Sequence, residues 1–377
     1  MSYRTVAIPA VERISVRWDE SPNTFALAQW DSLVERSSGT DVTQLSAWAV
    51  IRARVGFSPV FLFAYQGGAL VGGCLVQRRR LFGVLRVCYV PYGPLVDTSR
   101  ADASVVTPVL LRELTKLAES SAMTFIQPPE NADDLSFRLL ANGFRHSSAG
   151  IAPAGSYRLD LTRPLADIRS GFSARLKSWT NRWESKGVTV RRGDTEDLPI
   201  LGDLIAATAA RQGFPPPPVD HLDSIYRELS PAGHSALFIG EVDGRPVAAD
   251  LVTMLGDTVH GRRCGFDSSG AAGRLSVPAA VRWTIINWAK TEGYRWLDFG
   301  GLPEQMLADM LDKGIRSSDA WPSGHRSKLA FNGEPFRYPP AVELVRPFAV
   351  RWVYDMARRN TYGRRVIVRV KSALRVR

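Results

Sequence analysis

A pattern of a hairpin, a helix and a short strand occurs twice in the 377-residue chain, and it limits the folds that the chain can adopt. Each hairpin consists of two apolar runs around a glycine-containing turn. Each helix has a proline near its start, where the missing N–H costs no hydrogen bond. The copies lie about 170 to 175 residues apart at every element, which indicates a duplicated unit; chance similarity of common patterns is the alternative. The hairpins, helices and strands of the two copies span 59–80 and 235–255, 107–122 and 277–293, and 123–129 and 295–301.

An antiparallel hairpin followed by a crossover helix and a further strand forms an α/β unit with a mixed sheet. We therefore predict an α/β fold of two tandem domains whose sheets are mixed but mainly antiparallel. The first domain would cover residues 1–155 and would be completed by a C-terminal helix within residues 341–377. The second domain would cover residues 156–340.

The chain has a net charge of +11, and most of the excess lies in the tail from residue 346 onward. This charge favours a polyanionic partner, either a nucleic acid or an anionic membrane surface. The alternative explanation of the charge is that this chain uses arginine wherever it needs a solvated charged residue. No apolar run has the length of a signal-peptide core or a membrane span, and the three cysteines lack metal-ligand spacing. We therefore expect a cytoplasmic protein without a metal, with peripheral contact at the inner face of the membrane as a further expectation.

Five short motifs follow one another along nearly the whole chain. They are QLSAWAVIR (44–52), YVPYGPLVD (89–97), ATAARQGF (207–214), LDFGGL (297–302) and RSKLAFNGEP (326–335). The duplicated unit resembles tandem acyltransferase domains of the GNAT type, and the motifs resemble one branch, the Fem family (FemABX-like) of aminoacyl-tRNA-dependent aminoacyltransferases. The chain departs from the family's pattern at Tyr92, Ser327 and Asn332, and in the proline run 215–218.

The resemblance implies transfer of an amino acid from its ester on the 3′ end of tRNA to an amine or hydroxyl acceptor. The acceptor would be the stem peptide of a peptidoglycan precursor or, as for some relatives, a small metabolite in antibiotic biosynthesis. The proline run stiffens a loop near the implied acceptor site, which disfavours a nucleotide-linked precursor and leaves a lipid-linked precursor or a small molecule. No cofactor is expected, because aminoacyl-tRNA is a co-substrate.

The same resemblance implies roles for particular residues. Lys328 would stabilise the oxyanion that forms when the amine attacks the ester. Arg52 and Arg211 match positions that hold a phosphate group of the precursor, for which the planar guanidinium is suited. For each of these cations, an ordinary solvated surface residue is the alternative. The acceptor site would also include Trp48, Tyr89, Asp97, Gly300 and Gly301.

The stretch RWLDFGG (295–301) ends a predicted strand on an acid followed by two glycines. Glycines at a strand end let a substrate approach the backbone closely. Asp298 either accepts a proton from the attacking amine, or polarises it, or only fixes the turn. The same choice applies to Asp97, for which a turn or cap role is favoured.

Two basic segments are candidates for contact with tRNA. Residues 170–192 are predicted to form a basic helix that ends at Gly187 and leads into a strand, and residues 343–360 a final amphipathic helix. In the first segment Trp179 and Trp183 are core residues in the alternative interpretation. The predicted tRNA contacts are Lys177, Arg182, Lys186, Arg358, Arg359, Arg364 and Arg365.

Two other functions compete with aminoacyl transfer. A coenzyme A-dependent N-acyltransferase needs a glycine-rich turn that holds a pyrophosphate at a helix start. The segment 77–83 lacks the first glycine of the usual pattern, 262–267 ends in an aspartate, and 268–274 has its glycines in the wrong order. The other rival is a non-catalytic adaptor that binds RNA or an anionic membrane through its tail.

Overall fold

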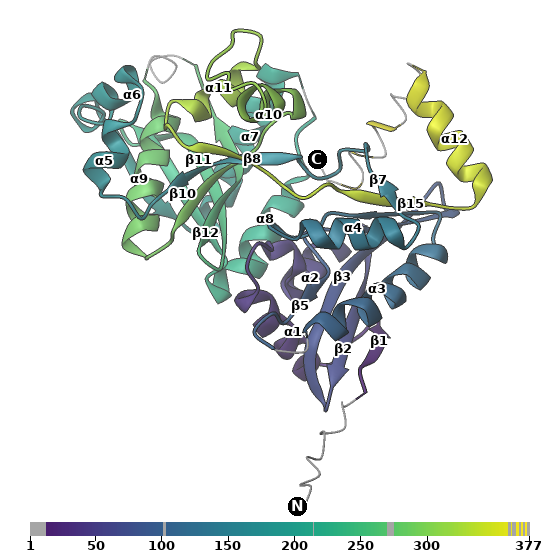
Figure 1. Cartoon of the computed structure of the whole chain (residues 1–377). Coiled ribbons are helices and arrows are strands. Elements are labelled where there is room, and N and C mark those ends of the chain that lie inside the picture. Colours follow the sequence, from purple (N-terminus) through teal and green to yellow (C-terminus); the bar gives the residue numbers. More distant parts are fainter. Residues whose placement is uncertain are drawn as a thin grey trace, which may run out of the picture.

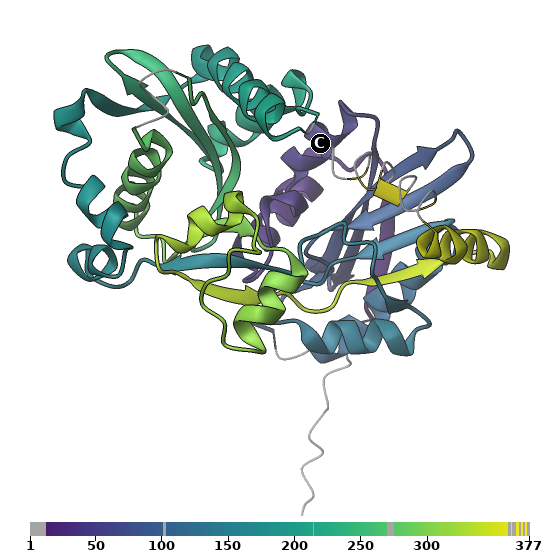
Figure 2. The same ribbon diagram turned by 90° about the horizontal axis from the view of Figure 1, so that it is seen from above.

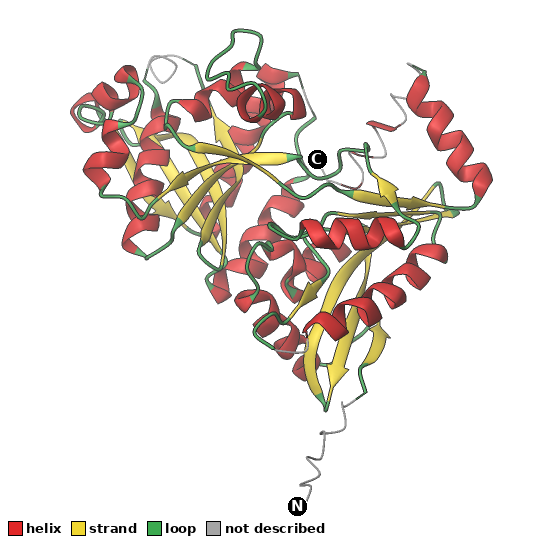
Figure 3. Ribbon diagram, in the orientation of Figure 1, coloured by secondary structure: helices red, strands yellow, loops and turns green. Residues whose placement is uncertain are grey.

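The computed structural model describes residues 13–100, 103–213, 215–269 and 275–360, together with residues 363, 367–368, 371 and 374. These residues form two sheets with helices packed on them (Figures 1 and 3). In each sheet the described strands pair antiparallel except for one parallel pair, β4–β6 in the first and β12–β13 in the second. The predicted α/β fold with two mixed, mainly antiparallel sheets is therefore confirmed.

The first sheet contains the first predicted hairpin, in which β2 and β3 meet at the pair Gln66 and Ala69. Helix α3 then crosses to β6, which runs parallel to β4. The chain returns to this sheet near its C-terminus, where β15 inserts between β6 and β7. The order is β1 (Ser15–Asp19), β2 (Ser58–Gln66), β3 (Ala69–Leu81), β4 (Leu85–Val90), β6 (Met123–Ile126), β15 (Val342–Val345) and β7 (Arg145–His146), with β5 (Leu95–Val96) beside β3.

The second sheet repeats this plan. Its hairpin, β10 and β11, meets at the pair Val242 and Arg245, and helix α9 crosses to β13, which runs parallel to β12. The parallel pairing covers only residues 258–260 of β12 and ends at the pair His260 and Asp298. The order is β14 (Glu334–Arg337), β8 (Gly155–Asp160), β13 (Trp296–Gly301), β12 (Thr258–Phe266), β11 (Arg245–Leu255), β10 (Ser235–Val242) and β9 (Val188–Gly193).

The helices cover the sheets and join them. Those of the first half are α1 (Thr24–Arg36), η1 (Val42–Gln44), α2 (Ser46–Ala53), α3 (Ala103–Glu119) and α4 (Asp133–Ala141), and α12 (Phe348–Arg359) follows β15. Those of the second half are α5 (Leu165–Ser170), α6 (Ala174–Trp179), η2 (Glu184–Lys186), η3 (Thr195–Asp197), α7 (Leu198–Gln212), α8 (Val219–Leu229), η4 (Ser230–Ala232), α9 (Val277–Thr291), α10 (Glu304–Leu311) and α11 (Ser323–Leu329).

One of the apolar clusters is shared by the two halves. It contains side chains of α1, α2, α7 and α8, and α2 packs against α8; the α1–α2 region (purple) lies between the two sheets in Figure 2. Trp30 of α1, Leu201 of α7 and Ile225 of α8 are fully buried in this shared cluster, and each such side chain contributes about 1.5–3 kcal/mol through burial. Ion pairs also cross the junction, so the relative position of the sheets is fixed by packing and by charge. These pairs are Arg54–Glu228, Arg158–Glu130 and Arg262–Asp41.

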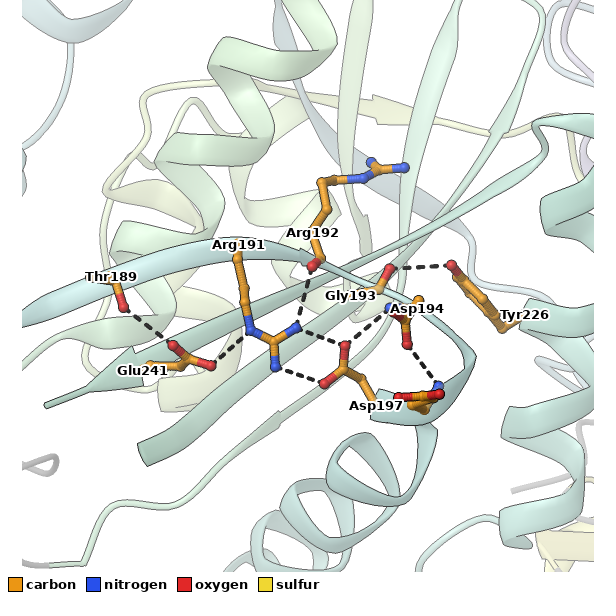
Figure 4. Close-up of polar contacts among 9 residues, drawn as sticks. Thr189, Arg191, Arg192, Gly193, Asp194, Asp197, Tyr226 and Glu241 are labelled. Atoms are coloured by element: carbon orange, nitrogen blue, oxygen red, sulfur yellow. Dashed lines mark hydrogen bonds and ion pairs between the residues drawn. The ribbon is translucent and has the colours of Figure 1, made fainter. Parts of the chain in front are cut away.

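Contacts at the edge strand β9 position helices α7 and α8 (Figure 4). Arg191 forms ion pairs with Asp197, at the start of α7, and with Glu241 of β10, at 2.7 and 2.8 Å. The hydroxyl of Tyr226 on α8 donates to the carbonyl oxygen of Gly193 at 3.2 Å. The two helices that face the first half are therefore tied to the sheet of the second half.

The prediction of one continuous basic helix from residue 170 to Gly187 is wrong, but the strand predicted after it is confirmed as β9 (Val188–Gly193). Ser173 caps the short helix α6, which ends at Trp179, and a separate turn, η2, ends at Gly187 with a left-handed φ of 73°. Trp179 donates from Nε1 to the carbonyl oxygen of Ser276 at 3.0 Å, and both Trp179 and Trp183 pack against the core of the second half. The tryptophans therefore belong to the core.

The final helix begins later than the sequence predicts. Residues 342–345 form strand β15, and helix α12 starts at Phe348, directly after Pro347. Pro347 has no N–H to donate, so it suits the helix boundary better than the interior. The tail residues Arg364 and Arg365 lie outside the described residues, as does most of the glycine-rich stretch 268–274.

Candidate functional site

A cavity of about 980 Å³ lies at the junction of the two halves. Helix α2 contributes Trp48 and Arg52, which are four residues apart and so share one helix face. Strand β12 of the second half contributes two further arginines. The cavity also contains Tyr89 and Gly301, so four of the predicted site residues come together here. The other polar lining residues include Thr43, Gln77, Tyr92, Gln127, His221, Arg262, Arg263, His325 and Tyr338.

Arg52 lies at the buried side of this cavity. Its guanidinium stacks on the ring of Phe57 at 3.7 Å and donates from Nη2 to the carbonyl oxygen of Leu374 at 2.5 Å. Burial lowers the pKa of Arg52 to about 9, so it still carries a full charge at neutral pH. The alternative of a solvated surface arginine is therefore wrong for Arg52.

Several buried polar atoms on the lining residues have no hydrogen-bond partner among the described residues. Four of them are N–H donors: Nε1 of Trp48, Nε of Arg52, Nε2 of Gln77 and Nε of Arg262. A buried donor left unpaired costs about 1–3 kcal/mol, and buried polar groups are nearly always paired. Oxygen atoms of an anionic ligand in the cavity can accept from such donors.

His221 is a further lining residue with an unpaired atom, Nδ1. Burial and the neighbouring arginines lower the pKa of His221 to about 3. Its ring contacts the Trp48 ring edge-on, with centroids 6.5 Å apart. His221 is therefore neutral at physiological pH and adds hydrogen-bonding capacity without charge.

Arg262 links the cavity to the domain junction. Its Nη2 donates to both carboxylate oxygens of Asp41 at 2.9 Å, and its guanidinium lies 5.1 Å from the centroid of the Trp48 ring. The pair crosses from β12 to the start of η1. The ion pair holds the arginine in place while its Nε stays unpaired.

Lys328 lies where helix α11 meets the end of β13. Its Nζ donates to the carbonyl oxygens of Gly300 and Gly301 at 2.8 and 3.0 Å. Burial, with a smaller effect from the charge of Arg282, lowers the pKa of Lys328 to about 8. Gly301 lines the cavity, whereas Lys328, Gly300 and Asp298 are not among its lining residues. The alternative of a solvated surface lysine is wrong.

Asp298 is buried beneath the same strand end. Its carboxylate accepts hydrogen bonds from the Gly300 N–H at 2.6 Å and from the Ser156 hydroxyl, and it lies 3.7 Å from Nδ1 of His260. Burial alone would raise the pKa of Asp298, but His260, Ser156 and the Gly300 N–H together lower it. The ionised carboxylate therefore holds the turn in which Gly300 adopts a φ of 87°.

Two predicted acceptor residues lie elsewhere. Arg211, at the end of α7, donates to the carbonyl oxygen of Phe266 and to the Ser268 hydroxyl, both at 3.0 Å. Asp97 pairs with Arg36 at 3.0 Å and also accepts from the Ser99 hydroxyl. Neither residue is among those that line the cavity.

The predicted tRNA contacts are spread over two surfaces. Lys177, Arg182 and Lys186 are exposed residues around α6 and η2, but they share no continuous helix. Lys177 also donates to the carbonyl oxygen of Ser170 at 2.9 Å. At the other end of the molecule, α12 carries Arg358 and Arg359 in its last turn.

Sequence reasoning missed part of the cavity. Arg262 and Arg263 belong to the segment 262–267, which the sequence analysis considers only as a turn that could bind pyrophosphate. Two adjacent arginines within the strand were the signal that could have indicated an anion site. Gln77 is a polar residue within an apolar run, which is a weaker signal. Nothing in the sequence around His221 marks it. No group of three His, Cys, Asp or Glu side chains that could hold a metal ion lies within the described parts of the chain.

Comparison with known proteins identifies a domain family and several proteins that the chain resembles. Residues 170–308 match the family model of the acetyltransferase (GNAT) domain. The chain is 24% identical over 232 residues to the lipid II:glycine glycyltransferase of Staphylococcus saprophyticus, covering 59% of this chain and 56% of the relative. It is 25% identical over 224 residues to the enzyme of the same name from Staphylococcus aureus, covering 56% and 53%. The chain thus spans about half the length of the curated relatives it matches.

Solved structures show the same architecture over most of the chain. A crystal structure of FemX superposes with a TM-score of 0.73 at 16% identity, covering 88% of this chain and 98% of the other. The structure of L-PGS from Bacillus licheniformis gives a TM-score of 0.55 at 13% identity, covering 95% and 99%.

The fold and the matched segment define a protein of two tandem GNAT-like domains. Within that class the chain is similar to the Fem family, as the ordered motifs of the sequence predict.

Proposed function

We propose that the protein is an aminoacyltransferase that moves an amino acid from aminoacyl-tRNA to an amine of a peptidoglycan precursor. The observation that carries this proposal is the junction cavity, whose arginines and unpaired N–H donors suit a diphosphate-bearing acceptor. The relatives named lipid II:glycine glycyltransferase support a lipid-linked precursor as that acceptor. A small metabolite is the alternative acceptor.

Lys328 is the residue we assign to the chemical step. The acceptor amine attacks the ester carbonyl, a C–N bond forms, and the C–O bond to the terminal ribose breaks; the proton lost by the amine passes to the departing ribose oxygen. The charged Nζ of Lys328 stabilises the oxyanion that develops on the carbonyl. With a pKa of about 8 the lysine is mostly protonated at neutral pH, as this role requires.

Asp298 acts on this step through the backbone. Its oxygens are occupied by Ser156 and by the Gly300 N–H, beside His260, so it is poorly placed to accept a proton from a substrate. It instead fixes the turn whose carbonyl oxygens hold Lys328. We therefore assign Asp298 as a positioning residue.

A transfer assay tests the proposed reaction. Total tRNA is charged with radiolabelled amino acids and incubated with the purified chain, with and without lipid-linked precursor. We expect label to move from tRNA into the precursor in a ribonuclease-sensitive manner, and the labelled product identifies the amino acid. Consumption of acetyl-CoA with no movement of label from tRNA would instead establish a coenzyme A-dependent acyltransferase.

A further inference from the structure

Helix α12 exposes a broad apolar face. Phe348 is 80% and Trp352 57% exposed, and Val353 and Met356 are also exposed. These residues recur at the spacing of one helix face. Isolated exposed apolar residues are common on protein surfaces. Four on one face of one helix form a patch of the kind that marks an interaction site for a protein, a membrane or a ligand.

Helix α12 is fixed to the first sheet through Tyr354 and Asp355. Tyr354 is buried, and its hydroxyl donates to Glu343 of β15 at 3.3 Å. Asp355 accepts two hydrogen bonds from Arg145, at 2.7 and 2.9 Å. The helix is therefore held with its apolar face turned outward, at the outer edge of the first half (Figure 1).

A second apolar projection lies beside this helix. The turn between β3 and β4 exposes Phe82 to 75% and Val84 to 80%. Val84 and Phe348 line the same hollow of about 1010 Å³. The charged residues of that hollow are Arg80, Arg86, Arg346 and Arg351, with Glu119 as the acid among them.

We infer that the apolar face of α12, together with the β3–β4 turn and the arginines of the hollow that Val84 and Phe348 line, docks on the anionic face of a phospholipid bilayer. An amphipathic helix with an aromatic apolar face and flanking arginines is suited to lie at the boundary of headgroups and acyl chains, and each arginine near an anionic surface adds attraction. Phe, Trp, Val and Met on one face favour lipid over nucleic acid, which offers phosphates but no apolar interior. No helix among the described residues is long and apolar enough to cross a bilayer, so α12 would lie along the surface.

Sedimentation of the full-length chain with vesicles tests this inference without any aminoacyl donor, so its outcome does not depend on the proposed reaction. The vesicles contain phosphatidylcholine with phosphatidylglycerol, or phosphatidylcholine alone. We expect binding to the anionic vesicles, weaker binding at high salt, and a loss of about tenfold or more in affinity for the double variant Phe348→Ser/Trp352→Ser. Arg351→Gln should lose about fivefold.

A matched double variant controls for the loss of exposed aromatic area. Phe25 and Phe137 are 70% and 67% exposed on α1 and α4, and Phe25→Ser/Phe137→Ser should bind vesicles as the wild type does. A second pair on the helix, Val353→Ser/Met356→Ser, should repeat the loss if the first variant folds poorly. Equal vesicle binding by wild type and both α12 variants, or loss of tRNA binding alone in those variants, would overturn the inference.

Discussion

The strand turn at Asp298 and the cavity at Arg52 both bury charge, but they differ in how that charge is paired. At the turn, the Asp298 carboxylate and the Lys328 ammonium group have hydrogen-bond partners at 2.6 to 3.0 Å. In the cavity, donors on Trp48, Arg52 and Gln77 are buried and unpaired. A paired cluster is a preorganised part of the fold, whereas buried unpaired donors need a further partner, which water or a ligand can supply.

The largest expected effect lies at the paired cluster. Asp298→Ala removes the acceptor of the Gly300 N–H and the Ser156 hydroxyl and leaves His260 without its carboxylate. We expect a loss of about 4 kcal/mol in the free energy of unfolding, measured by urea denaturation. Asp97→Ala, whose partner Arg36 is exposed, should lose about 1 kcal/mol or less. Equal losses in the two variants would remove the distinction between the turn and the surface.

Lys328→Ala should lower kcat about 10² to 10³-fold, because it removes the cation that stabilises the oxyanion. The affinity for the acceptor should change much less, since the unpaired donors belong to the cavity. Single-turnover transfer rates and equilibrium binding separate these two quantities. Wild-type kinetics in the Lys328→Ala variant would refute the oxyanion assignment.

Arg52→Gln should weaken acceptor binding by about 2 kcal/mol, or roughly thirtyfold, because it removes a buried positive charge from the cavity. Arg211→Gln is the matched control, since the resemblance gives both arginines the same role but only Arg52 lines the cavity. The sequence resemblance alone predicts that Arg211→Ala also weakens acceptor binding. A larger loss for Arg211→Gln than for Arg52→Gln would favour the sequence prediction over the geometry.

The smallest expected effect is a dependence of the rate on pH. The pKa of Lys328 is lowered from 10.5 to about 8, so its stabilising charge is present below pH 8 and is lost as the pH rises through that value. The single-turnover rate should therefore fall about tenfold per pH unit above 8. In Lys328→Arg the fall should disappear, because arginine keeps its proton. The same fall of the rate in the wild type and in Lys328→Arg would show that another group ionises.

The repeat in the sequence was enough to predict the two sheets, because hairpins and crossover helices depend on local signals. The strand β15 was missed because residues 342–345 become a strand only through pairing with β6 and β7, which are distant in the chain. The continuous helix predicted from residue 170 to Gly187 was wrong for a related reason, because Trp179 and Trp183 pack against the core of the second half.

The motifs located Lys328, Trp48 and Arg52, whose setting the structure shows to be buried. They did not reveal His221 or Gln77, because the cavity that these residues line is formed by residues from both halves of the molecule. They also gave Arg52 and Arg211 one role, although the two arginines lie in different surroundings. Family motifs therefore located some residues of the cavity but did not predict which residues line it together.

Calorimetric titration of the full-length chain with inorganic pyrophosphate asks whether the junction cavity binds an anion, because this probe carries only the oxygen acceptors that the unpaired donors require. We expect one binding site whose affinity falls roughly thirtyfold in Arg52→Gln, is retained in Arg211→Gln and Lys328→Ala, and is weakened by salt. Absence of binding by the wild type, or equal affinity in Arg52→Gln, would show that the junction cavity is not an anion site.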